Sequence, residues 1–571
     1  MMPKKNGRTS SNMELSAAIG PAESRRHRVL MIAESALALA AAWLFLRSAW
    51  LSDDAFISLR QVEMFVTGHG MVWNLGHRVQ AFTHPAWFVL LSVGRALTGS
   101  LYYMTIAVSA ACVAGTLWIY WRACRATDHL PAVTVMLMAL PLLSVAFRDY
   151  MTSGLENPLS FLLVAVVFAL LPKVDEARAR RLVWIVLALA VLNRQDLALQ
   201  LGPLALWLLL RRDPLRELVL AVPGILLLLL WFGFATLYFG SPLPNTFYAK
   251  MSSGLPAEFI HDLGARYFII NAFSHPFTSA VIFVGTVAGL AGGPANRLIA
   301  VGILLHLVDL YRIGGDFMQG RVLSVDFLFA CFLLVRAWPG GRRLHVASLG
   351  AVCAIGLILE PSYLVRTRLE PGSFVYVTDE RQFYYHSYGM LSESRVWPVR
   401  QAGEGGGRVR HVAMSCGFIG AARIRWPDTI YLIDSCGLTD PFLARMPVAL
   451  RDLPDMRTGH FFRTVPANIA DVILGEDRWL PDRSSRPLWA DIELITTAPL
   501  FDRDRLAAVW RLSTGAHAFD RSVWAHPETA EYEVITHGKW LTGQPQQPYS
   551  IYPSEAHRLL MEKMLSQSRG S

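Results

Sequence analysis

Residues 29–60 read VLMIAESALALAAAWLFLRSAWLSDDAFISLR, a long apolar run followed at once by a polar segment with two adjacent aspartates. An apolar run of this length can cross a hydrocarbon core of about 30 Å as a helix. It follows the basic stretch Arg25–Arg28 and has no convincing small-residue cleavage site, so we expect an uncleaved first membrane span. Asp53 and Asp54 then lie at the mouth of a membrane helix, where carboxylates are costly.

Most of the chain has the same apolar character. Of its 571 residues, 53% are hydrophobic and only 17% are charged, which is too little polar surface for a water-soluble globular protein. Apolar stretches of about 16–23 residues, long enough to span a bilayer, recur as far as Leu359. We therefore predict a cytoplasmic, disordered N-terminus (1–28), an α-helical polytopic membrane domain (29–360) and a soluble domain (361–571).

The soluble domain is predicted to be mixed α/β, because short β-branched and aromatic runs at 409–420 and 429–438 are bounded by Gly and Pro. Each run contains one cysteine. If the domain lies outside the cytoplasm, Cys416 and Cys436 can form a disulfide; two unpaired buried thiols are the alternative. The net charge of +9 does not indicate nucleic-acid binding, since the basic residues sit in short clusters between apolar runs.

These basic clusters predict the orientation of the chain in the membrane, because Lys and Arg concentrate on the cytoplasmic side. The clusters lie at 25–28, 177–181, 211–216, 297 and 336–343. Polar loops then fall outside at 52–56, 81–87, 152–158, 192–196, 242–250 and 311–321. The pattern predicts roughly eleven spans, with the amino end inside and the soluble domain outside.

Asp53 and Asp54 are the predicted catalytic residues. The spacing of Phe56, Leu59 and Phe65 after them predicts a short amphipathic helix on the membrane surface. One carboxylate at the amino end of that helix can be a cap, but capping alone does not account for two. Close like charges raise the pKa of one carboxyl group, which suits a general base near neutral pH.

The outer loops also carry cations and further carboxylates. The cations, which suit an anionic ligand, are Arg60, Arg78, His84, Arg194, Lys250 and Arg321. For each of them, a lipid headgroup contact or a snorkelling side chain is the alternative. Carboxylates at the membrane edge, such as Glu156, Asp196 and Asp316, are functional candidates by their position. The sequence contains no P-loop, HExxH motif or clustered His/Cys set, so we predict neither a cofactor nor a metal.

Taken in order, several stretches resemble the lipid-linked arabinofuranosyltransferases of the GT-C class, and most closely the mycobacterial terminal arabinofuranosyltransferase B family. The stretches are DDAFISLR (53–60), GHGMVWNLGHRVQAFTHPAW (68–87), SGLENPL (153–159), LNRQD (192–196), PNTFYAK (244–250), GGDFMQGR (314–321), DSCGLTDPFLARMP (434–447) and RTGHFFR (457–463). The resemblance covers roughly residues 30–470.

The resemblance implies a GT-C fold and a multi-pass enzyme of the bacterial inner (plasma) membrane whose active site and C-terminal domain face the periplasm or the cell exterior. Such an enzyme moves D-arabinofuranose from polyprenyl (decaprenyl) phosphate to a hydroxyl of a cell-envelope glycan or glycoprotein, with inversion. It implies Asp53 as the base and Asp54 as the orienting carboxylate. Donor phosphate would be bound by Arg60, His84, Lys250 and Arg321, and the sugar or acceptor by Glu156, Asn193, Arg194, Asn245, Asp316 and His460.

One departure and three alternatives remain. Relatives tend to carry an acidic residue in place of His77 or Gln80, which leaves the sugar and the acceptor open. A lipid-sugar flippase or transporter would be expected to show matched repeats, and none is visible. A receptor or scaffold leaves the paired aspartates unexplained. A GT-C enzyme that uses another sugar is the third alternative. The predicted partners are the lipid-linked sugar, the glycan acceptor and membrane lipids.

Overall fold

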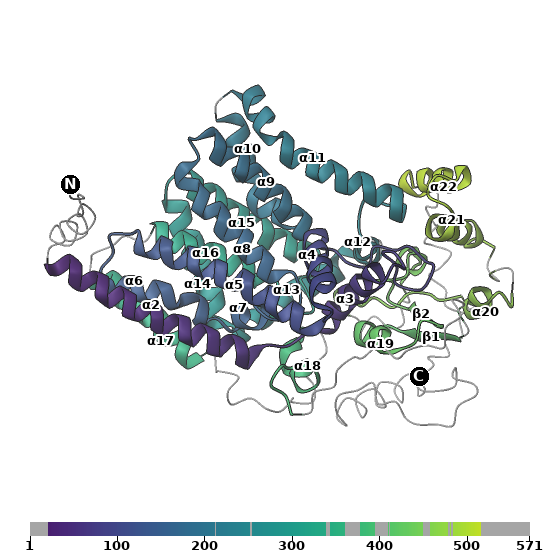
Figure 1. The fold of residues 1–571 in the computed structure, drawn as a ribbon, viewed down its shortest axis with the longest axis horizontal. Coiled ribbons are helices and arrows are strands. Elements are labelled where there is room, and N and C mark those ends of the chain that lie inside the picture. The colour runs from purple at the N-terminus through teal and green to yellow at the C-terminus, as the bar shows by residue number, and fades with distance from the viewer. Residues whose placement is uncertain are drawn as a thin grey trace, which may run out of the picture.

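The structure, a computed structural model, describes residues 21–211, 213–251, 254–337, 343–359, 377–393, 409, 411–448, 457–466, 468–477, 480 and 483–515. This part of the chain is mostly helical. A large group of helices makes up one side of the molecule, and a smaller C-terminal part with two strands lies beside it (Figure 1). Helix α2 (Pro21–Ser48) begins inside the segment predicted to be disordered. Its proline suits a helix start, and no residue before Val29 breaks the helix.

Most helices of the large group have apolar sequences. After α2 they are α3 (Asp53–Val66), α4 (Pro85–Thr98), α5 (Tyr102–Arg125), α6 (Pro131–Leu143), α7 (Val145–Tyr150), α8 (Asn157–Leu170), α9 (Ala177–Asn193), α10 (Leu197–Leu210), α11 (Pro214–Phe239), α12 (Asn245–Met251), α13 (Ala257–Ser274), α14 (Pro276–Ala291), α15 (Pro294–Arg312), α16 (Leu323–Ala337) and α17 (Arg343–Leu359).

Fewer helices than expected are long enough to cross a membrane. Within the described ranges, α2, α5, α11 and α15 have the required length and apolar character, and α13 with α14, bent by 106°, would make a fifth span. Four further apolar helices are shorter: α4, α6, α8 and α10. The architecture is that of a polytopic membrane protein, but roughly eleven spans are not confirmed. Apolar runs that were counted as spans form helices such as α4, of 14 residues, and α6, of 13 residues, which are shorter than the roughly 20 residues that a span needs.

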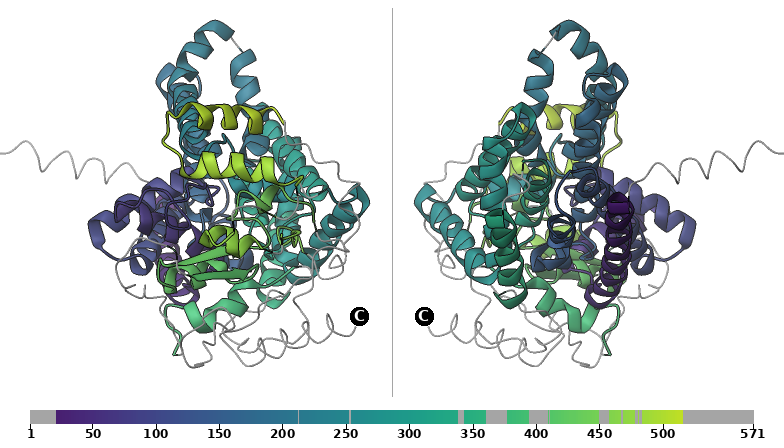
Figure 2. Two further views of the ribbon diagram at one scale, coloured as in Figure 1. Left: turned by 90° about the vertical axis from the view of Figure 1, so that its right-hand side faces the viewer. Right: turned by 90° about the vertical axis from the view of Figure 1, so that its left-hand side faces the viewer.

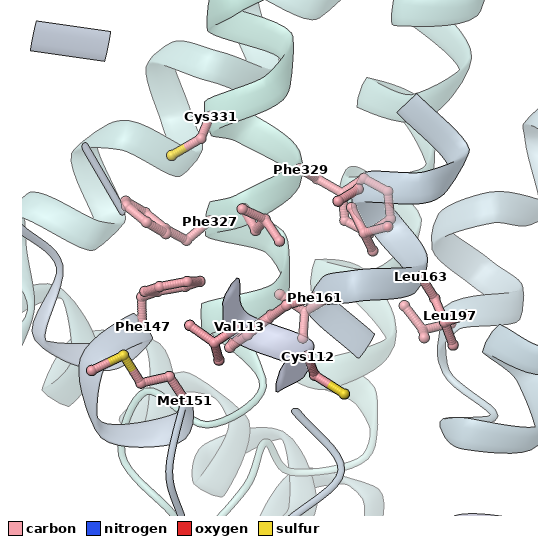
Figure 3. Packing of buried hydrophobic residues seen from close by; sticks show 14 of the residues in the cluster. Cys112, Val113, Phe147, Met151, Phe161, Leu163, Leu197, Phe327, Phe329 and Cys331 are labelled. Atoms are coloured by element: carbon pink, nitrogen blue, oxygen red, sulfur yellow. The ribbon is translucent and has the colours of Figure 1, made fainter. Parts of the chain in front are cut away.

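Helix α16 is the centre of the helical part. Every residue from Leu323 to Val335 is buried, Asp326 included, and nearly all of these residues are apolar, as expected for a helix surrounded by others. Aromatic pairs pack around it: Phe168 of α8 stacks on Phe332 at 4.4 Å between ring centroids. Figure 3 shows Phe147 of α7 beside Phe327 of this helix, and Phe147 in turn stacks on Phe161 of α8. These contacts join α7 and α8, which lie on either side of the polar segment at 152–156, to α16.

The C-terminal part contains α18 (Glu380–Tyr388) and then a β–α–β unit. Strand β1 (His411–Ser415) pairs in parallel with β2 (Ile430–Asp434), and α19 (Ile419–Arg425) connects them. Both strands fall in the runs where strands were predicted. The remaining helices are α20 (Ile469–Leu474), α21 (Arg486–Thr497) and α22 (Arg503–Ser513). Figure 2 shows α21 and α22, in yellow-green, lying across the end of α11.

Candidate active site

A pocket with an empty volume of about 360 Å³, partly open to solvent, lies where α3 meets the C-terminal part. Its polar lining comes from separate regions of the chain: Asp53 and Asp54 from α3, Glu380 from α18, and Arg457 and His460 from a later loop. The rest of the lining is Ile57, Phe317, Tyr384, Cys416, Gly417, Phe418, Ile419 and Leu438. The predicted catalytic aspartates therefore share a cavity with cationic and titratable side chains.

Asp53 is held by the C-terminal part and does not cap its own helix. The N-cap of α3 is Ser52, whose hydroxyl accepts from the Ala55 N–H. The Asp53 carboxylate instead accepts from the backbone N–H groups of Gly420, at 3.0 Å, and Ala421, at 2.8 Å. Only glycine fits at position 420, because an added Cβ would lie 2.0 Å from the Asp53 carbonyl oxygen.

The surroundings of Asp53 bring its pKa into the range of a base that works near neutral pH. Burial raises the pKa of Asp53 to about 7, and the N–H donors of Ala421 and Gly420 oppose this shift. The negative charges of Asp54 and Asp434 raise it further. The carboxyl group can thus accept a proton at physiological pH.

Asp54 faces Arg321, which three carboxylates surround. Arg321 Nη1 lies 3.8 Å from an oxygen of Asp54 and 3.8 Å from one of Asp316, and Nη2 lies 3.2 Å from Glu156. Burial raises the pKa of Asp54, while Arg321 and Lys250 lower it. The predicted residues Asp54, Glu156, Asp316 and Arg321 are thus brought together around one guanidinium.

Three more of the predicted residues contact Glu156. Its carboxylate lies 3.3 Å from His84 Nδ1 and 3.7 Å from Arg194 Nη1. Its carbonyl oxygen accepts from the Asn193 side chain at 3.0 Å. Burial alone would raise the pKa of Glu156, but Arg321, His84 and Arg194 lower it to about 2. His84, Asn193 and Arg194 therefore surround a buried carboxylate instead of lining the pocket.

Arg457 and His460 form the opposite wall of the pocket. The guanidinium of Arg457 lies 4.6 Å from the centre of the Phe317 ring, and His460 packs edge-on against the same ring. Burial, together with the nearby cations Arg457 and Lys250, holds the pKa of His460 well below its usual value, so its ring is neutral. Lys250 reaches this wall: a Cβ added at Gly459 would lie 3.4 Å from its Nζ.

Glu380 and Tyr384 line the pocket without having been predicted from the sequence. Burial raises the pKa of Glu380 to about 8; Arg457 opposes the shift, and Asp54 and Asp53 add to it. An acidic residue in the first turn of a helix normally indicates a favourable helix-dipole interaction, so Glu380 gave no sign of a functional role. Arg457 lies in the stretch RTGHFFR, from which the resemblance implies a place at the site for His460 and Arg463 but not for Arg457.

Two predicted ligands tie the C-terminal part to the helices and do not line the pocket. Arg60 forms a 2.6 Å ion pair with Asp428. The side-chain amide of Asn245 donates to the carbonyls of Gly437, at 2.8 Å, and Leu438, at 3.1 Å. Since Leu438 is part of the pocket lining, Asn245 supports the wall from behind.

Cys416 and Cys436, whose pairing was left open from the sequence, form a disulfide with a Cα–Cα distance of 5.1 Å. Because Cys416 lines the pocket, this bond fixes part of its wall. Within the described part of the chain, no group of three or more His, Cys, Asp or Glu side chains is arranged to hold a metal ion.

Two curated proteins match this chain, and both are named terminal beta-(1->2)-arabinofuranosyltransferase. The protein from Corynebacterium glutamicum is 26% identical over 334 residues, which is 51% of this chain and 48% of the relative. The protein from Mycobacterium tuberculosis is 27% identical over 347 residues, 52% of this chain and 53% of the relative. The chain thus spans about half the length of the curated relatives it matches. No family model and no solved structure matches it. The two matches confirm the resemblance seen in the sequence and relate this chain to arabinofuranosyltransferases.

Proposed function

We propose that this chain is an inverting GT-C glycosyltransferase of the bacterial inner membrane. It transfers D-arabinofuranose from a polyprenyl phosphate to a hydroxyl of a cell-envelope glycan or glycoprotein, on the periplasmic side. The observation that carries the proposal is the pocket in which Asp53, with its pKa of about 7, lies beside Asp54 and opposite Arg457 and His460. The two relatives support the choice of arabinofuranose.

In the proposed reaction, Asp53 is the general base. It removes the proton from the acceptor hydroxyl as that oxygen attacks the anomeric carbon, and the polyprenyl phosphate leaves with the electron pair of the broken C–O bond. A single displacement inverts the configuration at the anomeric carbon. The charge that develops on the sugar in the transition state is positive, so the adjacent Asp54 carboxylate stabilises it.

The leaving phosphate needs cations that carboxylates do not already neutralise. Arg321 is shared among three carboxylates, which suits it to orienting Asp54 more than to binding phosphate. We assign the phosphate to Lys250 and Arg457, which lie close enough to Asp54 to lower its pKa. The lipid phosphate is itself a leaving group, so the reaction as proposed uses no nucleotide, cofactor or metal.

The disulfide and the domain arrangement support the proposed topology. Disulfides persist in oxidising compartments, and the Cys416–Cys436 bond lies in the wall of the pocket, so a periplasmic location suits both the bond and the site. We keep 29–360 as the membrane catalytic domain and 361–571 as the periplasmic domain. The pocket is built from both.

The test is a transfer assay with the purified protein in nanodiscs. The donor is polyprenyl phosphoryl arabinofuranose, the acceptor is a synthetic arabinan, and NMR of the product reports the new linkage. We expect one arabinofuranosyl residue to be added with inverted anomeric configuration. Transfer with retention, or transfer only from a soluble nucleotide sugar, would contradict the proposal. If the protein transferred only a different lipid-linked sugar, the proposed reaction class would stand and arabinofuranose would be the wrong sugar.

A further inference from the structure

A series of charged side chains with alternating signs leads from the pocket into the packed helices. It starts at Arg321, which contacts Asp54 of the pocket, and passes through Glu156 to Arg194, at 3.2 Å and 3.7 Å. The Nε of Arg194 donates to Asp196 at 3.0 Å. Beyond Asp196, at the start of α10, the series of charged residues continues to α15 and α16. The proposed reaction assigns no role to the residues there.

His306 of α15 is the next member of this series of charged residues. Its side chain is 1% exposed, and both ring nitrogens face carboxylates: Nε2 lies 3.3 Å from Asp196, and Nδ1 lies 2.9 Å from Asp326 of α16. Asp326 is fully buried and also accepts from the side-chain amide of Gln200. The backbones of α10 and α15 approach closely here, since a Cβ at Gly302 would lie 1.9 Å from the Gln200 carbonyl oxygen.

This geometry favours a protonated ring, because a carboxylate oxygen faces each nitrogen; the side-chain amide of Gln200 also lies 3.1 Å from Nδ1. A neutral imidazole has one N–H donor, so one of its nitrogens would present a lone pair to a carboxylate oxygen. An imidazolium donates to both Asp196 and Asp326. The charges from Asp326 to Arg321 then alternate in sign through His306, Asp196, Arg194 and Glu156, and they sum to zero. Burying such a set is tolerable only when every member keeps its partner.

We infer that His306, held as an imidazolium between Asp196 and Asp326, is a positioning residue that acts on the active site through Arg194 and Glu156. The inference rests on the proposed function. Without the positive charge at His306, Asp196 draws Arg194 away from Glu156. The Arg321 guanidinium then moves toward Glu156 and away from Asp54, so Asp54 loses the group that orients it. A purely structural clamp between α10, α15 and α16 would stabilise the protein without this effect on catalysis.

Two substitutions separate the two sides of the ring. His306→Gln keeps a donor near the position of Nε2, facing Asp196, whereas His306→Asn keeps one near that of Nδ1, facing Asp326. Displacing a catalytic group by a fraction of an ångström can cost orders of magnitude in rate, so we expect His306→Asn to lower kcat about 30-fold and His306→Gln about fivefold. KM for the acceptor stays unchanged. Equal kcat for both variants and the wild type, with only Tm lowered, overturns the inference.

The matched control is Glu217→Gln, which removes the charge from another buried ion pair, 2.8 Å from Arg180, between α9 and α11. It should lower Tm and leave kcat within twofold of the wild type. A double-mutant cycle tests the route through Arg194. If His306 acts through that residue, His306→Asn costs little more kcat once Arg194→Lys is present; independent effects multiply and contradict the route.

Nitrogen-15 NMR of the histidine-labelled wild type needs no turnover. The His306 signals are assigned by their loss in His306→Gln. Both ring nitrogens should be protonated at pH 7.5; a neutral ring overturns the inference even if transfer is observed. A protonated ring in a protein that transfers no sugar from any lipid donor would instead count against the proposed function alone.

Discussion

The carboxylate of Asp53, at the start of α3, accepts a hydrogen bond from the backbone N–H of Gly420, a residue 367 positions further along the chain. The proposed base is therefore positioned by the C-terminal part, through the first turn of α19. The pocket is therefore formed by both the membrane helices and the β–α–β unit, so a change in either part should alter catalysis.

Replacing Gly420 by alanine tests this dependence. The new Cβ would lie 2.0 Å from the Asp53 carbonyl oxygen and 2.9 Å from the Ile57 nitrogen, so α19 must move away from α3. We expect kcat to fall at least about tenfold, as the base shifts from its position. Gly233→Ala is the control, because that helical glycine has no atom within 4 Å of an added Cβ. Full activity in Gly420→Ala would show that α19 does not position the base.

The pH dependence of transfer should report Asp53. Only the ionised carboxylate accepts a proton, so kcat/KM should rise with pH through an apparent pKa of about 7. Asp54 raises the pKa of Asp53; removing its charge with Asp54→Asn should therefore move this acidic limb to lower pH in the residual activity. Asp262→Asn, at an exposed pair with Arg266, should leave the limb in place. A limb that moves to higher pH in Asp54→Asn would exclude Asp53 as the group that titrates.

Arg60 and Lys250 should behave differently, although both were predicted to bind the donor phosphate. Arg60 is 1% exposed and paired with Asp428. Arg60→Gln removes the shorter of two contacts from a guanidinium to Asp428, which keeps Arg423 at 3.7 Å, so it should lower Tm and leave KM for the lipid donor unchanged. Lys250→Gln should raise that KM and leave Tm unchanged. Thermal unfolding and donor titrations measure both. If Arg60→Gln raised the donor KM without a loss of Tm, Arg60 would be a phosphate ligand after all.

The disulfide should stabilise the pocket wall. Cys416 and Cys436 are 20 residues apart, and in the chain-entropy description closing a loop of this length contributes about 3 kcal/mol. A variant with both cysteines changed to serine should unfold at a lower temperature than the wild type. A reducing agent should lower Tm of the wild type toward that of the variant and leave the variant itself unchanged. Equal melting temperatures without reductant would mean that the bond adds no stability.

The sequence predicted the outline of the site because the loop motifs are dense in charged residues and fall on one side of the helices. Asp54, Glu156 and the pair Asp316 and Arg321 come from three separate segments of the chain, yet they meet in the structure. The contacts with the C-terminal part could not be predicted, since Asp53 to Gly420 and Arg60 to Asp428 are pairings between distant segments with no periodic signal. Glu380 could not be predicted either, because an acidic residue in the first turn of a helix normally indicates only a helix-dipole interaction.

The number of spans was the weakest prediction, because hydropathy records how apolar a run is and not where its helix ends. The run that includes α6 shows this, since the helix starts at Pro131 and stops at Ser144, whose hydroxyl caps the next helix, α7. Likewise, His275 and Pro276 separate α13 from α14 at a bend of 106°. Helix ends depend on such local residues, which a window average does not resolve.

The most direct test of the central claim, that the pocket around Asp53 and Asp54 is the active site of a lipid-linked sugar transferase, is the initial rate of arabinofuranosyl transfer in nanodiscs. The wild type, Asp53→Asn and Asp54→Asn are compared at equal amounts of protein with matched melting curves. Loss of a general base lowers the rate by a factor of about 10²–10⁴. The initial rate of Asp53→Asn should therefore be at least about 100-fold below that of the wild type, and the rate of Asp54→Asn should also be lower. Wild-type rates in both variants would contradict the claim.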